Sequence, residues 1–290
     1  MLTKCIKITL RNFKQLFHSI KKLILRFQSQ TTVTKMSGRF YRSLFLSFLF
    51  SFASIITHAQ NSYLPVRDIS FKMQTALAIR MDSLQKEFKA KGLEWPVRYM
   101  FIRSFKYDGQ LEVWVKNQAK EKYKLFKTYR VCLLSGAMGP KRMQGDFQVP
   151  EGFYYINEFN PRSNYHLALG LNYPNASDKI LSDSLRPGNG IYIHGSCVSV
   201  GCIPVTDEDI EEIYLIASSA KASGEDFIPV HVFPVRYDRK KSLEFFENYT
   251  RNNPSLEKFG LQLKAAFDKF EATKEVPLVM VDRKGAYVID

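Results

Sequence analysis

The sequence predicts a mainly β, α+β fold in which a few helices flank one catalytic-sized domain. Short segments rich in β-branched and aromatic residues recur between turn signals from residue 99 to residue 233. Beyond residue 60, three longer segments place apolar residues at helical spacing, and no internal repeat is present. A chain of 290 residues can bury a sizeable core around such a sheet.

The first helical segment runs from about residue 69 to residue 91. Its apolar residues, from Ile69 to Phe88, recur at helical spacing, and Gly92 follows as a stop signal. We interpret it as a packing helix. Strands are expected next at 99–103, 110–116, 124–134 and 148–156, with Asp108-Gly109 as a hairpin turn and 135–140 as a loop.

Residues 161–190 carry turn signals and no strong periodicity, which is typical of a functional loop or lid. An apolar strand is then expected from Ile191, followed by a helix over 207–220. Thr206 stands at the N-cap position of that helix, with Asp209 three residues later. A strand at 228–233, helical spacing around 256–270, and a hairpin of 276–281 with 286–289 complete the expected elements.

The positive charge of the chain is concentrated at its start. The formal net charge is +14, but ten basic residues and no acidic residue lie in residues 1–42, which leaves 32 basic against 28 acidic residues elsewhere. A dense phosphate-neutralising patch is therefore not expected, and the sequence argues against nucleic-acid binding.

Residues 36–59 have the layout of a secretory signal. Arg39 and Arg42 precede an apolar run of 13 residues, Leu44–Ile56, and Ala59 marks a cleavage point. This run is short for a membrane span, so the membrane is expected as a partner only if the signal stays uncleaved. Met36 is a candidate start, which would make residues 1–35 a mis-assigned extension; alternatively they form a basic amphipathic, lipid-binding helix.

We therefore expect an exported, periplasmic protein of five segments: the extension 1–35, the signal 36–59, a helical extension 60–97, a catalytic domain 98–237, and a C-terminal helix and hairpin extension 238–290. The exported part has three cysteines, Cys132, Cys197 and Cys202. An odd number leaves at least one free thiol.

The candidate active site is the segment from His194 to Cys202. A cysteine attacks carbonyls as a thiolate and needs a base or a lowered pKa. His194 ends the predicted strand and could serve as that base if the loop folds back. The Gly195 carbonyl could orient the imidazole, and the N–H groups of Gly201 and Cys202 could form an oxyanion hole.

Other interpretations use the same residues. His194 could be a satisfied strand-end histidine and Cys202 a buried apolar residue. Zinc ligation by His194, Cys197, Cys202 and His231 lacks the usual ligand spacing, so no metal or other cofactor is expected. A disulfide between Cys197 and Cys202 is a further alternative, and Cys132 is expected in the core.

His194-Gly195 followed by Ser199-x-Gly201-Cys202 resembles the signature of the YkuD-type L,D-transpeptidases, and more closely that of their YafK-like branch. The similarity spans roughly residues 98–237. Val200 replaces the histidine of the family's box, and Ile203-Pro204 stands where Ile-Arg is usual. Further motifs resemble that branch: Ser135-Gly136, Gly139-Pro140-Lys141, Gly145-Asp146, 150–154, Asn160-Pro161, 165–167 and 173–176.

The resemblance implies a sandwich-like or barrel-like β domain that acts on peptidoglycan stem peptides. Cys202 would form a thioester next to a diaminopimelate L-centre, with His194 as base, and a second amine would complete transpeptidation. Water would complete hydrolysis instead, as in branch members that detach a peptidoglycan-linked lipoprotein. Ser199 and Val200 are expected to bind substrate. His166 could also contact it, but a packed loop histidine is the favoured interpretation of that residue. An inactive peptidoglycan-binding module is the non-enzymatic alternative.

Overall fold

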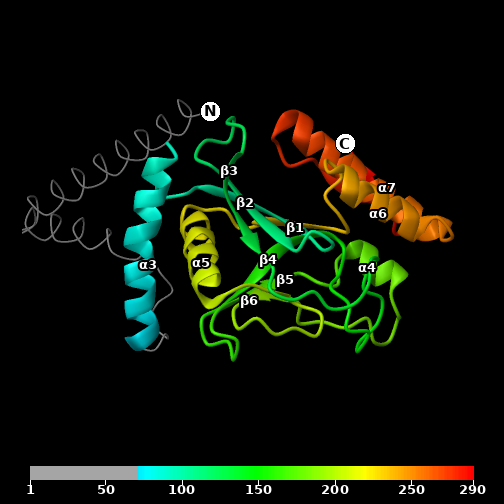
Figure 1. Cartoon of the computed structure of the whole chain (residues 1–290), viewed down its shortest axis with the longest axis horizontal. Helices are drawn as coiled ribbons and strands as arrows, with labels where there is room; N and C mark the ends of the chain where they lie inside the picture. Colours follow the sequence, from blue (N-terminus) through cyan, green and yellow to red (C-terminus); the bar gives the residue numbers. More distant parts are fainter. Residues whose placement is uncertain (1–70) are drawn as a thin grey trace, which may run out of the picture. The chain divides into compact units, whose positions relative to one another are not determined.

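The structure, a computed structural model, describes residues 71–290. A curled mixed sheet of eight strands lies at the centre of this part of the chain (Figure 1). Its order is β3-β2-β1-β8-β4-β5-β6-β7. The strands are β1 (Tyr99–Phe105), β2 (Gln110–Lys116), β3 (Lys124–Arg130), β4 (Gly152–Asn160), β5 (Ala168–Leu171), β6 (Tyr192–His194), β7 (Ile203–Pro204) and β8 (Pro229–Phe233).

Strand β4 joins the two halves of this sheet. Its first residues, Gly152 to Tyr155, pair antiparallel with β8, whereas Ile156 to Asn160 pair with β5. The register shifts between Ile156 and Glu158, and an irregularity of this kind bends a strand and increases its twist. The short strands β5, β6 and β7 therefore form a separate edge region that carries the candidate site.

Helix α5 (Asp207–Ala222) packs into the main core. Ile210, Ile213 and Ala217 are completely buried in the cluster that also contains Ile193 of β6. The side chain of Thr206 accepts a hydrogen bond from the Asp209 N–H, which confirms the predicted N-cap. The helix therefore starts at a fixed point immediately after β7.

Helix α3 (Phe71–Ala90) lies beside α5 (Figure 1). Arg80 of α3 forms ion pairs with Glu211 and Glu212 of α5. Leu84 and Phe88 add apolar side chains to the main core. This contact gives the N-terminal helix the packing role that the sequence predicted.

The C-terminal elements form a second layer on the side of the sheet opposite α3 and α5 (Figure 1). They are α6 (Lys240–Thr250), α7 (Pro254–Thr273), and a hairpin of β9 (Val279–Val281) with β10 (Tyr287–Ile289). Phe267 of α7 packs against Phe105 and Phe233 of the sheet. Gly260 leaves room for the ring of Phe246, because an added Cβ would lie 2.2 Å from that ring.

The predicted mainly β, α+β class is confirmed, as are the hairpin at Asp108-Gly109 and the C-terminal hairpin. Three expectations were wrong in detail. Residues 161–190 contain β5 and a short helix, α4 (Ala176–Leu181), rather than loop alone. Helix α6 was not predicted, and the expected strand at 148–156 begins later, as β4.

None of the helices between residues 71 and 290 is long and apolar enough to cross a membrane. The predicted signal at 36–59 and the extension 1–35 lie outside the described residues.

Candidate active site

Strands β6 and β7 bring His194 and Cys202 to one face of the sheet. They pair in parallel, with Ile193 opposite Ile203 and His194 opposite Pro204. Because side chains alternate along strands about 4.8 Å apart, Ile193 and Ile203 point together into the core. Cys202, one residue before β7, therefore lies on the same face as His194. The loop between them folds back, which was the condition for His194 to act as base for Cys202.

Both side chains open into a cavity of about 360 Å³. Its walls come from the β4–β5 connection, from β6, and from the loop that ends at Cys202. The lining residues are Asn160, Arg162, Ser163, Asn164, Tyr165, Ala168, Gly190, Tyr192, His194, Val200 and Cys202. Val200, predicted to contact substrate, is 72% exposed at this wall.

His194 is held by the backbone of its neighbour. The Nδ1 atom lies 2.6 Å from the Gly195 carbonyl oxygen, so Nδ1–H is the donor and Nε2 carries the lone pair. Burial lowers the pKa of His194 below its usual value, and the Gly195 carbonyl partly opposes this change. The imidazole is therefore neutral at pH 7 and can accept a proton at Nε2.

Cys202 is the free cysteine of the described chain and is half-buried. Its Sγ lies 3.6 Å from the Gly190 carbonyl oxygen. Burial raises the pKa of the Cys202 thiol, while the backbone N–H of Tyr192 and the charge of Lys141 act in the opposite direction. The resting pair is thus a thiol and a neutral imidazole, and attack requires transfer of the thiol proton to the base.

The predicted oxyanion donors already have a partner. Ser199 Oγ accepts hydrogen bonds from the N–H groups of Gly201, at 3.2 Å, and Cys202, at 2.8 Å. It also donates to the Cys202 carbonyl oxygen at 2.8 Å. In this conformation Ser199 therefore orders the turn formed by residues 199–202, called the nucleophile turn below. These two N–H groups do not form an open oxyanion hole.

Gly201 is required by the same turn. Its φ is +129°, which side chains disfavour, and an added Cβ would lie 3.3 Å from the backbone oxygen of Gln148. The turn thus passes directly beside the segment that precedes β4.

A disulfide between Cys132 and Cys197 ties the loop between base and nucleophile to the segment after β3. The expectation that Cys132 belongs to the core was wrong, because it is only half-buried and bonded to Cys197. The alternative disulfide between Cys197 and Cys202 is likewise excluded by this pairing. The free thiol inferred from the odd cysteine count is Cys202.

His166 is not among the residues that line the cavity; it packs against α5, as a packed loop histidine would, and its contact with substrate stays a prediction. Its Nε2 lies 2.9 Å from Glu211 Oε1 on α5. Gly195 lies close to both His166 and Asp207. A Cβ atom added at Gly195 would lie 3.1 Å from the His166 Cβ and 2.6 Å from Asp207 Oδ1. Asp207 also accepts a hydrogen bond from the Ser196 N–H. These residues support the start of the loop 195–201 from the α5 side.

Sequence reasoning missed two residues of the site. The Tyr165 ring contacts the His194 ring, with centroids 4.8 Å apart. Lys141, which lowers the Cys202 pKa, is buried and paired with Asp146. Both lie in motifs that carried the family resemblance, but local spacing does not relate Tyr165 to His194, 29 positions later, or Lys141 to Cys202, 61 positions later.

The zinc alternative finds no support in residues 71–290, which contain no group of three His, Cys, Asp or Glu side chains able to hold a metal ion. Cys197 is in the disulfide. His231 is buried on β8, with the rings of Phe101 and Phe153 each 4.7 Å from its own. Burial lowers its pKa to about 3.

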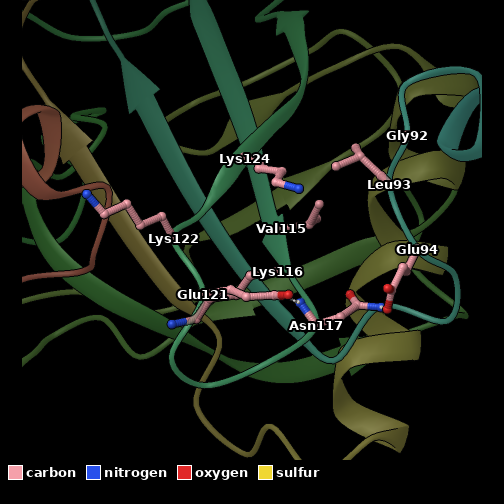
Figure 2. A pocket seen from close by; sticks show the side chains of 9 residues that line it. All are labelled: Gly92, Leu93, Glu94, Val115, Lys116, Asn117, Glu121, Lys122 and Lys124. Atoms are coloured by element: carbon pink, nitrogen blue, oxygen red, sulfur yellow. Dashed lines mark hydrogen bonds between the residues drawn. The ribbon is translucent and has the colours of Figure 1, made fainter.

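A second pocket lies at the far end of β2, between this strand and the segment after α3 (Figure 2). It measures about 60 Å³, and its lining contains neither histidine nor cysteine. Asn117 bridges it by donating from its side chain to Glu94 and from its backbone to Glu121. This pocket therefore lacks the thiol and the imidazole that the first cavity contains.

Residues 108–232 match the family model described as YkuD, L,D-transpeptidase catalytic domain. The chain is also 35% identical over 209 residues to the protein named "Putative L,D-transpeptidase YafK" of Escherichia coli strain K12. That match covers 71% of this chain and 78% of its relative.

Among solved structures, the chain resembles the helical cell shape determining protein Pgp2 from Campylobacter jejuni, with 20% identity and a TM-score of 0.39. This match covers 65% of the chain and 74% of Pgp2. Bd1075 from Bdellovibrio bacteriovorus is 19% identical with a TM-score of 0.36, covering 64% of this chain and 78% of Bd1075.

Proposed function

The chain belongs to the YkuD family of L,D-transpeptidase catalytic domains, and from that premise we propose that it is an exported, cysteine-dependent peptidoglycan L,D-transpeptidase. One observation carries the proposal: Cys202 and an oriented, neutral His194 share one face and one cavity. A thiol and a base placed in this way are the minimum requirement for acyl transfer through a thioester.

In the first half-reaction, Cys202 Sγ attacks the amide carbonyl carbon of a stem peptide next to a diaminopimelate L-centre. His194 Nε2 takes the thiol proton and then delivers it to the departing amine nitrogen as the C–N bond breaks. The products are a free amine and an acyl thioester on Cys202. His194 returns to its neutral form, so the proton count is balanced.

In the second half-reaction, an amine of another stem peptide attacks the thioester. His194 accepts a proton from this amine and returns it to the sulfur as the C–S bond breaks. Water in place of the amine would give hydrolysis, including release of a peptidoglycan-linked lipoprotein. The same thioester serves both outcomes, and the acceptor that reaches it determines the product.

Stabilisation of the tetrahedral oxyanion requires a change at the nucleophile turn. The N–H groups of Gly201 and Cys202 point to Ser199 Oγ at rest. We expect the substrate oxygen to take over these donors while the Ser199 hydroxyl turns away. Ser199 would then act as a placeholder that keeps the turn ordered until substrate arrives.

Export is supported by two independent features. The layout of residues 36–59 is that of a secretory signal. The disulfide between Cys132 and Cys197 belongs to the kind that persists in oxidising compartments such as the periplasm. Peptidoglycan stem peptides lie in the same compartment.

The test uses the purified full chain and the Cys202→Ala variant, each incubated with tetrapeptide muropeptides and with lipoprotein-linked sacculi. Mass spectrometry of the products is expected to show new L,D-crosslinks with the wild type and none with the variant. Release of lipoprotein or tetrapeptides without any crosslinks would show that the enzyme catalyses hydrolysis and not transpeptidation. Binding without turnover by either protein would favour the inactive module and overturn the proposal.

A further inference from the structure

A half-exposed aromatic ring covers the buried base of the site. The rings of Tyr165 and His194 have centroids 4.8 Å apart and an interplanar angle of 34°. The His194 residue is 2% exposed, whereas Tyr165 is 46% exposed. The tyrosine ring is therefore an outer layer between the imidazole and water, and it is also part of the cavity wall.

The backbone on both sides of Tyr165 fixes the position of its ring. The Tyr165 N–H donates to Ser163 Oγ at 3.0 Å. His166 follows with a φ of +71° and is anchored to Glu211. Leu167 is fully buried, and its carbonyl oxygen accepts the Gly195 N–H at 3.2 Å. A non-glycine residue in the left-handed region costs free energy and is retained where the surrounding structure requires it.

The hydroxyl of Tyr165 has no hydrogen-bond partner among the residues that the structure describes, so its location depends on these anchors and on ring packing. Phenylalanine at this position should keep the same contact with His194. This makes Tyr165→Phe a matched control for loss of the ring.

We propose that Tyr165 is a positioning residue whose ring holds the His194 imidazole against the Gly195 carbonyl and excludes water from it. The inference deepens the proposed function, because it assigns the element that keeps the base oriented and neutral for the Cys202 thiol. It requires no contact between Tyr165 and the reacting atoms.

The groups around the imidazole make water exclusion the main effect. Ala168 of β5 and Pro204 of β7 lie opposite His194 and carry no charge. The titratable groups that share its cavity are Arg162, Tyr165, Tyr192 and Cys202, and Asp207 of α5 contacts the following loop at Ser196. Burial is the largest cause of the lowered His194 pKa. Attraction between the aromatic face and imidazolium would instead raise the His194 pKa. Removing the ring should therefore raise this pKa if water exclusion dominates, and lower it if the aromatic attraction dominates.

The experiment measures the His194 pKa in the full chain by NMR titration of its imidazole, for the wild type, Tyr165→Ala and Tyr165→Phe. The chain has five histidines, and His194→Gln identifies the signal. The proposal predicts that Tyr165→Ala moves the pKa up towards 6.5, its ordinary value, while Tyr165→Phe leaves it at the wild-type position. An unchanged or lowered pKa in Tyr165→Ala would overturn the proposal.

Kinetics with muropeptides give the second measurement. We expect Tyr165→Ala to lower kcat about 10- to 100-fold, a larger factor than any rise in KM that follows from its place on the cavity wall, because a misoriented base loses part of its contribution. A rise in KM alone would make Tyr165 a substrate contact, and equal losses in Tyr165→Phe would assign the effect to the hydroxyl; either result overturns the proposal. If the wild type has no activity, the proposed function fails, and the NMR titration still decides the role of Tyr165.

Discussion

The Nδ1 atom of His194 lies 2.6 Å from the carbonyl oxygen of Gly195, so a neutral backbone group orients the imidazole where a carboxylate does so in Ser-His-Asp triads. A carbonyl fixes the tautomer without adding a negative charge that would stabilise imidazolium. Burial outweighs the opposing effect of the Gly195 carbonyl and leaves the pKa of His194 below its usual value, and burial also raises the pKa of the Cys202 thiol. In the proposed mechanism, the proton would therefore be transferred during attack, and no preformed thiolate–imidazolium pair is expected.

The first prediction concerns pH. His194 must be neutral to act as base, so kcat/KM should rise with pH through the His194 pKa and be lost below it. Because burial lowers that pKa, the acid limb of the profile should fall below pH 6.5. A pH profile of kcat/KM measures this directly. An acid limb at or above 6.5 would show that His194 is not the buried, neutral base described here.

The second prediction concerns the two glycines Gly201 and Gly224, which both have positive φ, +129° and +99°. Each alanine substitution should cost roughly 1–3 kcal/mol of stability, because a side chain strains the backbone there. Only Gly201→Ala should also remove activity, since its Cβ meets the Gln148 backbone and displaces Cys202. Gly224 has open space around it and is the matched control. Thermal melts and turnover assays of both variants provide the comparison.

If Gly201→Ala keeps wild-type turnover, activity does not depend on the present conformation of the turn before Cys202.

The third prediction concerns the disulfide. Cys132 and Cys197 are 65 residues apart, so the bond constrains a long segment of the unfolded chain. The double variant Cys132→Ser/Cys197→Ser should lose about 2–4 kcal/mol of unfolding free energy, measured by urea denaturation. Turnover should fall as well, because the bond anchors the loop between His194 and Cys202. The wild type treated with a reductant is the companion sample and should behave in the same way.

Equal stability and turnover before and after reduction would show that the disulfide does not support the site.

The fourth prediction separates support from substrate contact at His166. Loss of its hydrogen bond to Glu211 in His166→Ala should lower stability by about 1 kcal/mol. KM for muropeptides should stay unchanged, because His166 faces α5 and is absent from the cavity wall. Val200→Ala is the contrasting variant: its KM for muropeptides should change, since Val200 lies on that wall. A raised KM in His166→Ala would restore the substrate-binding role that the sequence suggested.

Local patterns were enough for much of the fold. Thr206 with Asp209, and the Asp108-Gly109 turn, are signals that act within four residues, and the structure confirms both. Strand β5 and helix α4 were missed because they are only four and six residues long. Asn175, within the segment expected to be loop, forms the capping box of α4 with Asp178.

The site was less accessible from sequence where it depends on distant segments. The closeness of His194 to Gly195 and Cys202 follows from one short loop, and the sequence suggested it. The pairing of Cys132 with Cys197, the ring of Tyr165 over His194 and the charge of Lys141 near Cys202 each depend on how β3, β4 and β6 are arranged. Spacing carries no information about such contacts, since it reports only neighbours along one element.

The occupied N–H groups at Ser199 show a further limit. A Gly-Cys turn indicates that donors can converge, but it does not show which acceptor they have at rest. That acceptor comes from the Ser199 rotamer, which depends on the folded loop.

The central claim is that Cys202 carries the acyl group. Intact-mass spectrometry of the full chain, quenched in acid during turnover of a tetrapeptide muropeptide, tests it most directly. We expect a mass increase equal to the acyl fragment on the wild type, located at Cys202 by peptide mapping and removed by hydroxylamine, and none on Cys202→Ala. A turnover-competent Cys202→Ala variant, or an adduct on another residue, would contradict it.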